Sequence, residues 1–188
     1  ADNGTIRYAA GQTTTNNGVI EAINGGVVDF ASSSRLQGSQ AYTADATSQI
    51  NLSSAKADAA VFAGDGLLNL VSGTSTFNDA TINIAETRIN HGTTMGMAGN
   101  TQLNGDIVML DGVGASASLR LSGTTALNGT GSIVFGTNQG NFINTVNDNF
   151  TLTIGNGITV RADAGNQGHI DLNATLAGTF DIDGLFVV

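Results

Sequence analysis

The apolar positions of this chain occur in short alternating runs. Val, Ile, Leu, Thr and Phe stand between polar residues, and Gly and Asn separate one run from the next, as in "LSGTTALNGTGSIVFG" at 121–136. Runs of this kind predict short β-strands joined by turns. One stretch, "SSAKADAAVFA" at 53–63, could form a helix, but it lies between two strand-like runs and we expect a loop and a strand there.

Several of these runs recur along the chain. "STFNDATINIAE", "TQLNGDIVMLDG" and "TALNGTGSIVFG" each place a large apolar residue and an Asn before an alternating strand. The large residues are Phe77, Leu103 and Leu127, which follow one another at nearly equal intervals. A second marker, Leu-x-Leu followed by Ser-Gly-Thr, is shared by "LNLVSGTSTF" and "LRLSGTTAL". Looser copies continue the spacing at Phe150, Leu176, Leu52 and Val27.

A period of about 23 to 26 residues suits a coil of three short strands and three turns, and it predicts a parallel β-solenoid of about seven coils. Each coil buries its inner face only against its neighbours, and Asn side chains stacked along the rod can bond to one another. The residues expected to point inward are Leu68, Leu70, Ile82, Ile84, Ile107, Met109, Leu119, Leu121, Ile133, Phe135, Leu152, Ile154, Ile158, Val160, Ile170 and Leu172.

An antiparallel β-sandwich or jelly roll is the alternative fold, because its strands also recur at short intervals. It does not explain matched segments about 25 residues apart. We treat 1–188 as a single β domain, with irregular coils or an assembly segment at 1–64 and regular solenoid coils at 65–188.

The charge balance excludes some partners. The net charge is -9, and the six Lys and Arg residues are scattered singly, so the sequence offers no basic stripe for nucleic acid. No apolar run is long enough to span a membrane. Because 40% of the residues are hydrophobic and only 11% are charged, the water-facing positions must be filled mainly by Thr, Ser, Asn, Gly and Ala.

Two phrases of the regular part carry a family likeness, "LSGTTALNGTGSIVFG" and "DNFTLTIGNGITVRADAGNQGHIDLNATLAGTFDIDG". They resemble the repeat region of secreted bacterial surface proteins, namely filamentous-haemagglutinin-like exoproteins and autotransporter passengers. The likeness covers 65–184. It implies a right-handed parallel β-helix, secretion to the cell surface or beyond it, and a role in adhesion or in extracellular fibres. It brings no catalytic residue and no cofactor.

Candidate metal ligands are few. Asp181 and Asp183 in "FDIDGLF" alternate as carboxylates do in a calcium loop, but the later ligands of such a loop are missing. We therefore expect no cofactor, with weak calcium binding at this turn as the alternative. The two histidines, His91 and His169, are separated by a stretch of sequence close to three coils, which is too far for a shared metal.

Catalysis on a β-helix requires carboxylates that converge on one groove, often with a cation beside them. Here the cations are thinly spread and Trp is absent. We expect no enzyme, and keep as the alternative a carbohydrate-binding or polysaccharide-degrading β-helix.

The two ends of the solenoid are the candidate interface. A β-helix presents unpaired strand edges at each end, and "FDIDGLFVV" offers neither a charge nor a helix after its last Gly to cap one of them. The residues expected at the interface are Ile6, Tyr8, Leu185, Phe186, Val187 and Val188. The sequence thus predicts a structural, secreted adhesin segment or fibre subunit. Its partners are expected to be further copies of itself or a longer solenoid, and host or bacterial surface glycans.

Overall fold

The computed structural model describes residues 1–110, 115–136, 140–145, 151–163, 168–171, 179–182 and 185–187, with the backbone alone from 171 onwards. Every regular element in these ranges is a strand. In chain order they are β1 (Thr5–Tyr8), β2 (Thr13–Thr15), β3 (Ile20–Ala22), β4 (Val27–Phe30), β5 (Arg35–Gln37), β6 (Ala41–Ala44), β7 (Gln49–Ser53), β8 (Lys56–Asp58), β9 (Val61–Ser72), β10 (Thr74–Asn78), β11 (Thr81–Ile89), β12 (Thr94–Leu103), β13 (Asp106–Met109), β14 (Ser118–Gly129), β15 (Ser132–Phe135), β16 (Asn141–Thr145), β17 (Thr151–Ile154), β18 (Thr159–Ala162), β19 (Gly168–Asp171), β20 (Thr179–Ile182) and β21 (Leu185–Val187).

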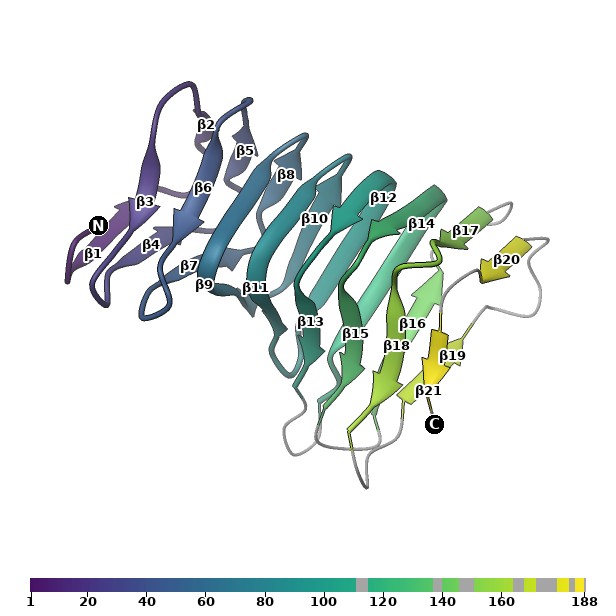
Figure 1. Cartoon of the computed structure of the whole chain (residues 1–188). Coiled ribbons are helices and arrows are strands. Elements are labelled where there is room, and N and C mark those ends of the chain that lie inside the picture. The colour runs from purple at the N-terminus through teal and green to yellow at the C-terminus, as the bar shows by residue number, and fades with distance from the viewer. Residues whose placement is uncertain are drawn as a thin grey trace.

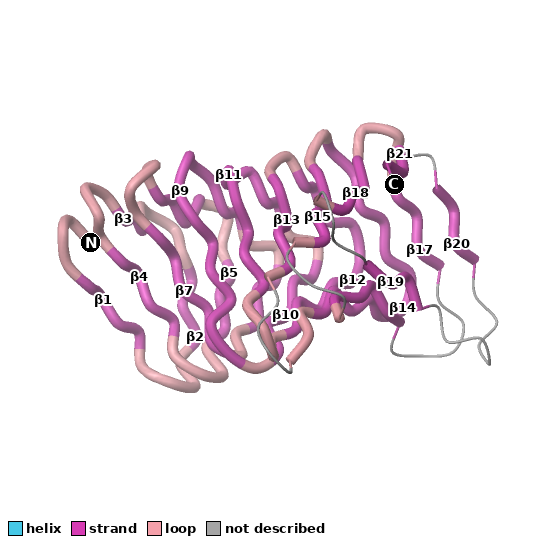
Figure 2. The backbone as a smooth tube through the Cα atoms, turned by 90° about the horizontal axis from the view of Figure 1, so that it is seen from below, coloured by secondary structure: helices cyan, strands magenta, loops and turns pink. Residues whose placement is uncertain are grey.

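The strands form three parallel stacks that wind around one core, with the two termini at opposite ends of the rod (Figures 1 and 2). Sheet A contains β1, β4, β7, β9, β11, β13, β15, β18 and β21. Sheet B contains β2, β5, β8, β10, β12, β14, β16 and β19. Sheet C contains β3, β6, β9, β11, β12, β14, β17 and β20. The long strands β9, β11, β12 and β14 turn a corner and belong to two sheets.

This arrangement confirms the predicted parallel β-solenoid and excludes the antiparallel sandwich, because every described strand pair is parallel. A new coil starts at β1, β4, β7, the second part of β9, the second part of β11, β13, β15 and β18, close to the expected number of about seven.

The coils differ in length, and a constant period of roughly 25 residues is wrong for the first part of the rod. One step along sheet A runs from Val27 to Gln49, and the next, from Gln49 to Leu67, is shorter. Later steps are longer, as from Ser132 to Thr159. The coils differ in length because the corners between their sheets differ. A loop at 45–48 separates β6 from β7, whereas β11 turns the same corner at a register shift between positions 84 and 86.

Both repeat markers found in the sequence therefore match strands that belong to different sheets. Phe77 lies in sheet B, whereas Leu103 pairs in sheet C. Likewise, Leu68 lies in sheet A and Leu119 in sheet B. The shared motifs are similar because strands of all three sheets need the same inward residues and the same corner residues, whichever sheet they enter.

The N-terminal part consists of coils of the same plan. Residues 1–64, expected to be irregular, pair with the coils that follow them, and position 64 lies inside β9. The 53–63 stretch contains β8 and the start of β9, which confirms the expected loop and strand.

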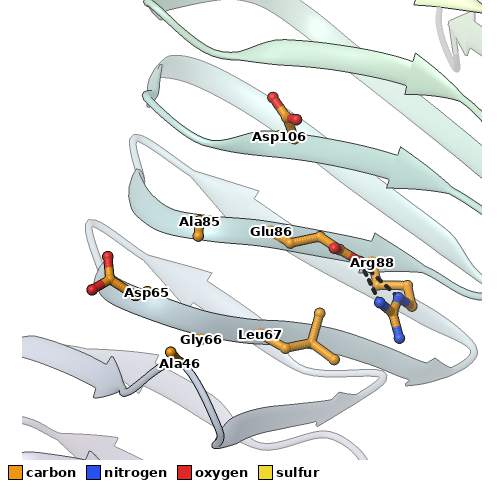
Figure 3. A pocket seen from close by; sticks show the side chains of 8 residues that line it. All are labelled: Ala46, Asp65, Gly66, Leu67, Ala85, Glu86, Arg88 and Asp106. Atoms are coloured by element: carbon orange, nitrogen blue, oxygen red, sulfur yellow. Dashed lines mark hydrogen bonds and ion pairs between the residues drawn. The ribbon is translucent and has the colours of Figure 1, made fainter.

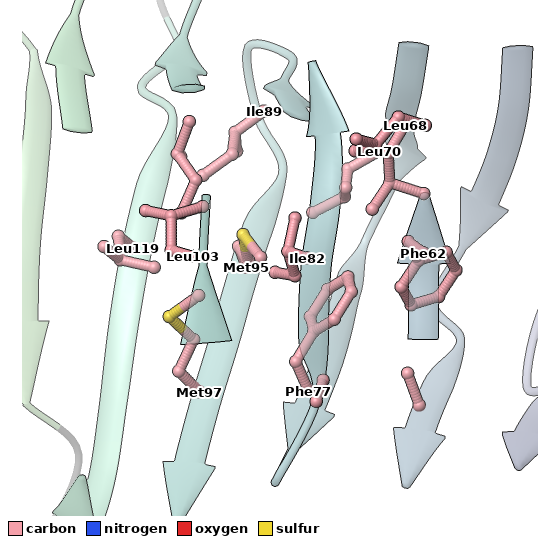
Figure 4. Packing of buried hydrophobic residues seen from close by; sticks show 14 of the residues in the cluster. Phe62, Leu68, Leu70, Phe77, Ile82, Ile89, Met95, Met97, Leu103 and Leu119 are labelled. Atoms are coloured by element: carbon pink, nitrogen blue, oxygen red, sulfur yellow. The ribbon is translucent and has the colours of Figure 1, made fainter. Parts of the chain in front are cut away.

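The core occupies the space between the three sheets (Figure 4). All the predicted inward residues up to Val160 are buried, with at most 5% of their surface exposed. Ile170 is partly buried, and Leu172 lies outside the described residues. Stacking of Asn along the rod is also confirmed. The Asn69 side chain donates to Asn51 at 3.1 Å and accepts from Asn90 at 2.7 Å.

Candidate assembly ends and charged surfaces

In the described chain, the first coil leaves the core uncovered on its outer side. In the described chain β1, β2 and β3 pair on one side only, with β4, β5 and β6. Ile6 stands opposite the buried Val28 and occupies a core position, yet it is 48% exposed. Tyr8 is partly buried and stacks on Phe30 with ring centroids 4.6 Å apart. The first coil of the described chain thus combines apolar side chains with a strand edge to which another strand could be added.

The C-terminal end has the same plan in its backbone. Among the described residues, β19, β20 and β21 pair only with β16, β17 and β18. Phe186 stands opposite the buried Val160, and its neighbours Leu185 and Val187 pair with Thr159 and Arg161. Val188 lies outside the described residues.

A single column of register partners connects the two predicted groups of interface residues. It begins at Ile6, passes through a core position in every coil, and ends at Phe186. Its members are Ile6, Val28, Ile50, Leu68, Thr87, Ile107, Ile133, Val160 and Phe186. The two ends of the rod therefore present the first and the last position of the same column.

Only one of the two candidate metal ligands lies among the described residues. Asp181 lies in β20 opposite Thr153, and Asp183 lies outside the described residues. The described ranges contain no group of three or more His, Cys, Asp or Glu side chains that could hold a metal ion. His91 follows β11, whereas His169 lies in β19, three strands further along sheet B than the strand that follows His91. The expected distance of about three coils is confirmed.

An acidic groove of about 340 Å³ lies at the corner where sheet C passes into sheet A (Figure 3). Asp65, Glu86 and Asp106 line it from successive coils, and Glu86 accepts a hydrogen bond of 2.8 Å from Arg88. One coil earlier, Asp45 occupies the same corner and accepts a hydrogen bond of 2.7 Å from the Asn24 amide. Hydrogen bonds from Ser48 and then from Asn24 lower the pKa of Asp45 to about 2.

Sheet B carries the opposite charge on its outer face. Arg35 and Lys56 are register partners, and both contact Asp58, at 2.7 and 3.4 Å. Arg120 continues the same column beyond Gly96, which lines a groove of about 270 Å³. The sequence suggested that the cations are thinly spread, and the fold places three of the six in a single column of this face.

Sequence reasoning missed both charged surfaces, although a signal was present. Asp45, Asp65, Glu86 and Asp106 recur once per coil along the shorter coils of the rod. A search fixed on a longer and constant spacing passes over them.

Comparisons with known proteins add no family. No protein-family model matches the chain, and neither a curated protein nor a solved structure is significantly similar to it. The fold agrees with the resemblance to filamentous-haemagglutinin-like and autotransporter proteins only at the level of a β-solenoid, so membership of that group stays a prediction. Within the described residues, no helix has the length and apolar character needed to cross a membrane.

Proposed function

We propose that this chain is a secreted structural protein, an adhesin segment or the subunit of an extracellular fibre, and that its coils continue end to end into another copy. The observation that carries the proposal is the core column from Ile6 to Phe186, whose first member is half exposed in the described chain. Stacking the last coil of one copy on the first coil of the next would extend all three sheets and cover Ile6 and Tyr8.

Coils of unequal length are no obstacle to such a contact. Inside the rod, the sheet A step from 86 to 106 is followed by a longer one from 106 to 132, and the strands stay in register across both. The first sheet A step runs from 5 to 27 and the last from 159 to 185. The difference in length between these two is smaller than the difference between the two steps inside the rod. A junction between copies would therefore repeat a transition that the fold already makes.

Ile6→Lys tests this proposal on the complete chain. A lysine in the open core column would bring a charge into the junction, so we expect wild-type protein to form rods that lengthen with concentration and the variant to stay monomeric. Val71→Lys is the matched control, because Val71 is also partly exposed, at 43%, but lies in the middle of the rod. Negative-stain microscopy and sedimentation velocity measure length and mass. Removal of 184–188 should have the same effect as Ile6→Lys.

The proposal fails if wild-type protein remains a compact monomer at high concentration, or if Ile6→Lys and Val71→Lys assemble equally. Turnover in a reducing-sugar assay, or binding on a glycan array that leaves assembly unchanged, would favour the alternative of a carbohydrate-active or carbohydrate-binding β-helix.

A further inference from the structure

The outer face of sheet B is the basic surface of an acidic protein. Between β5 and β14 its outward side chains include Arg35, Lys56 and Arg120, against a single carboxylate, Asp58. That carboxylate already contacts both Arg35 and Lys56. Arg120 forms no ion pair with another residue of the described chain. This face therefore keeps a positive balance, although the whole chain has a net charge of -9.

The acidic corner lies on the other side of the rod. Each coil runs through sheets A, B and C in turn, so the corner where sheet C passes into sheet A is the edge of the coil that faces away from sheet B. Asp45, Asp65, Glu86 and Asp106 stand along this corner in successive coils. Glu86 is neutralised by Arg88, but the other carboxylates have no ion-pair partner among the described residues.

The two charged surfaces match in height along the rod. Asp45 precedes β7 and Lys56 follows it, so both flank one strand of sheet A. Asp106 and Arg120 are related in the same way, because Asp106 opens β13 and Arg120 lies in β14, the strand that follows. In the coils between these pairs, sheet B presents Gly96 and a groove. A longer side chain at this place would keep a second copy from approaching closely.

From this geometry we infer that parallel copies associate sideways, with the basic face of sheet B on one copy against the acidic corner of the next. Two rods placed side by side without axial shift bring Lys56 opposite Asp45 and Arg120 opposite Asp106. Since the contact uses two different surfaces on opposite sides of the chain, it is heterologous. Copies related by a sideways translation repeat this contact without closing, which produces an open layer. This contact is independent of the proposed end-to-end junction.

The strength of the contact should depend on salt in a particular way. Exposed ion pairs are individually weak, so several coils must engage together. The net charge of each copy repels its neighbour over long distances at low salt, whereas the local pairs act at short range. Screening reduces the Debye length to about 10 Å at 0.1 M salt and about 3 Å at 1 M. Sideways association should therefore be strongest at about 0.1 M salt and decline towards about 1 M.

A charge-reversal cycle on the full chain tests the inference. Arg120→Glu and Asp106→Arg should each weaken sideways association by about five- to tenfold, the loss of one exposed pair and its replacement by a repulsion. The double variant carries the pair in reversed order and should recover the wild-type level, as should an equal mixture of the two single variants. Arg161→Glu is the matched control, because Arg161 lies on sheet A. Small-angle scattering and the width of particles in micrographs provide the measurements.

Further arms keep the test decisive. Arg120→Gln removes the charge without reversing it, so it should weaken sideways association less than Arg120→Glu does. It replaces Arg120→Glu in the test if that variant folds poorly. Ile6→Lys should shorten the rods and leave their sideways association intact, which separates this inference from the proposed function. Sideways association that is unchanged in Arg120→Glu, or a double variant no better than the single ones, would overturn it. Binding of a soluble polyuronate to the wild-type face without any sideways association would assign the surface to an anionic glycan instead.

Discussion

The two halves of the rod are built on one plan with different side chains. In the N-terminal coils an aromatic stack, in which stacked and edge-to-face ring pairs alternate, runs along the core, with ring centroids 4.6 to 5.7 Å apart in consecutive pairs. Its members are Tyr8, Phe30, Tyr42, Phe62 and Phe77. Small buried residues fill the positions around it, namely Ala22, Ala44, Ala55, Ala57, Ala60 and Ala80. From β12 onwards the buried apolar residues of the described chain are mainly Leu, Ile, Val and Met.

A coil can therefore be filled by an aromatic ring and alanines in addition to aliphatic residues, or mainly by aliphatic residues. A protein interior must be close-packed whichever way its volume is divided. Because the rings in the N-terminal half contact one another from coil to coil, their packing is continuous along the rod, and it should be more sensitive to the loss of a single side chain than the aliphatic half.

Phe62→Ala should produce the largest effect. Phe62 is fully buried and contacts Tyr42 and Phe77 on either side, so its loss interrupts the stack twice. We expect a loss of about 4 kcal/mol in the free energy of unfolding, within the range for Phe→Ala in a core. Chemical denaturation followed by circular dichroism measures it. Hydrogen exchange should show lost protection in the N-terminal coils while β13 and β15 keep theirs, because each coil depends on its neighbours.

Two further variants sharpen that result. Ile133→Ala removes a buried residue from the aliphatic half and should cost about 3 kcal/mol. Val61→Ala, on the half-buried outer side of the same strand as Phe62, should cost less than about 1 kcal/mol. An equal loss of protection in both halves of Phe62→Ala would show that the two halves unfold as one unit.

Tyr42→Phe should have a smaller effect on the same stack. The ring stays in place, but the variant lacks the hydroxyl. In the wild type this hydroxyl lies within hydrogen-bond distance of two carbonyl oxygens, that of Gln37 at 3.0 Å and that of Thr14 at 3.2 Å. We expect a loss of about 1 to 2 kcal/mol, the usual cost of leaving buried acceptors without a donor. Thermal unfolding and denaturant titration at neutral pH provide the measurement.

The pH dependence gives an independent check on Tyr42. Burial raises the pKa of Tyr42 to about 12 from its ordinary value of 10.0. The folded state therefore holds the proton more tightly than the unfolded state, and the stability linked to it is present below pH 10 and lost as the pH rises towards 12. Tyr42→Phe should lack this part of the alkaline decline. A decline of equal size in the variant would contradict the assignment.

The sequence predicted the solenoid and its core because alternation of apolar residues is a local property of each strand. Leu119 and Leu121 reveal their inward direction by alternation alone, whichever sheet they join. The length of a coil is set by its corners, and these are not fixed by alternation. Gly64, with a φ of 112°, brings the chain so close to Ala44 that a side chain there would clash with the Ala44 carbonyl oxygen, and the short coil depends on this contact.

The candidate surfaces were predictable to different degrees. The sequence places Ile6 and Phe186 in its first and last apolar strands, and the structure gives both residues a place in the same column of sheet A. Their role in assembly stays a prediction. The basic face requires the register that places Lys56 beside Arg35 and Arg120 beside Gly96. Because that register follows coils of unequal length in sheet B, a constant period assigns these cations to unrelated faces.

The corners of the two halves also differ, and Asp45→Asn, which should have the smallest effect, tests that difference. In the N-terminal half the corner before β7 is closed by Asp45, whose carboxylate accepts hydrogen bonds from the amides of Asn24 and Thr47 at 2.7 and 3.0 Å. The equivalent corner before β18 contains Gly155 and Gly157. The pKa of Asp45 is lowered to about 2 from 3.8, so its contribution to stability is present above pH 3.8 and lost as the pH falls towards 2.

The acid profile of Asp45→Asn therefore separates two ways of holding a corner. Between these two pKa values the denaturation midpoint of wild-type protein should fall more steeply with falling pH than that of Asp45→Asn. Asp65→Asn at the same corner is the control and should follow the wild type, because Asp65 accepts none of these hydrogen bonds within the described chain. Parallel acid profiles for wild type and Asp45→Asn would mean that the N-terminal corners are held by their backbone alone, as the glycine corners of the other half are.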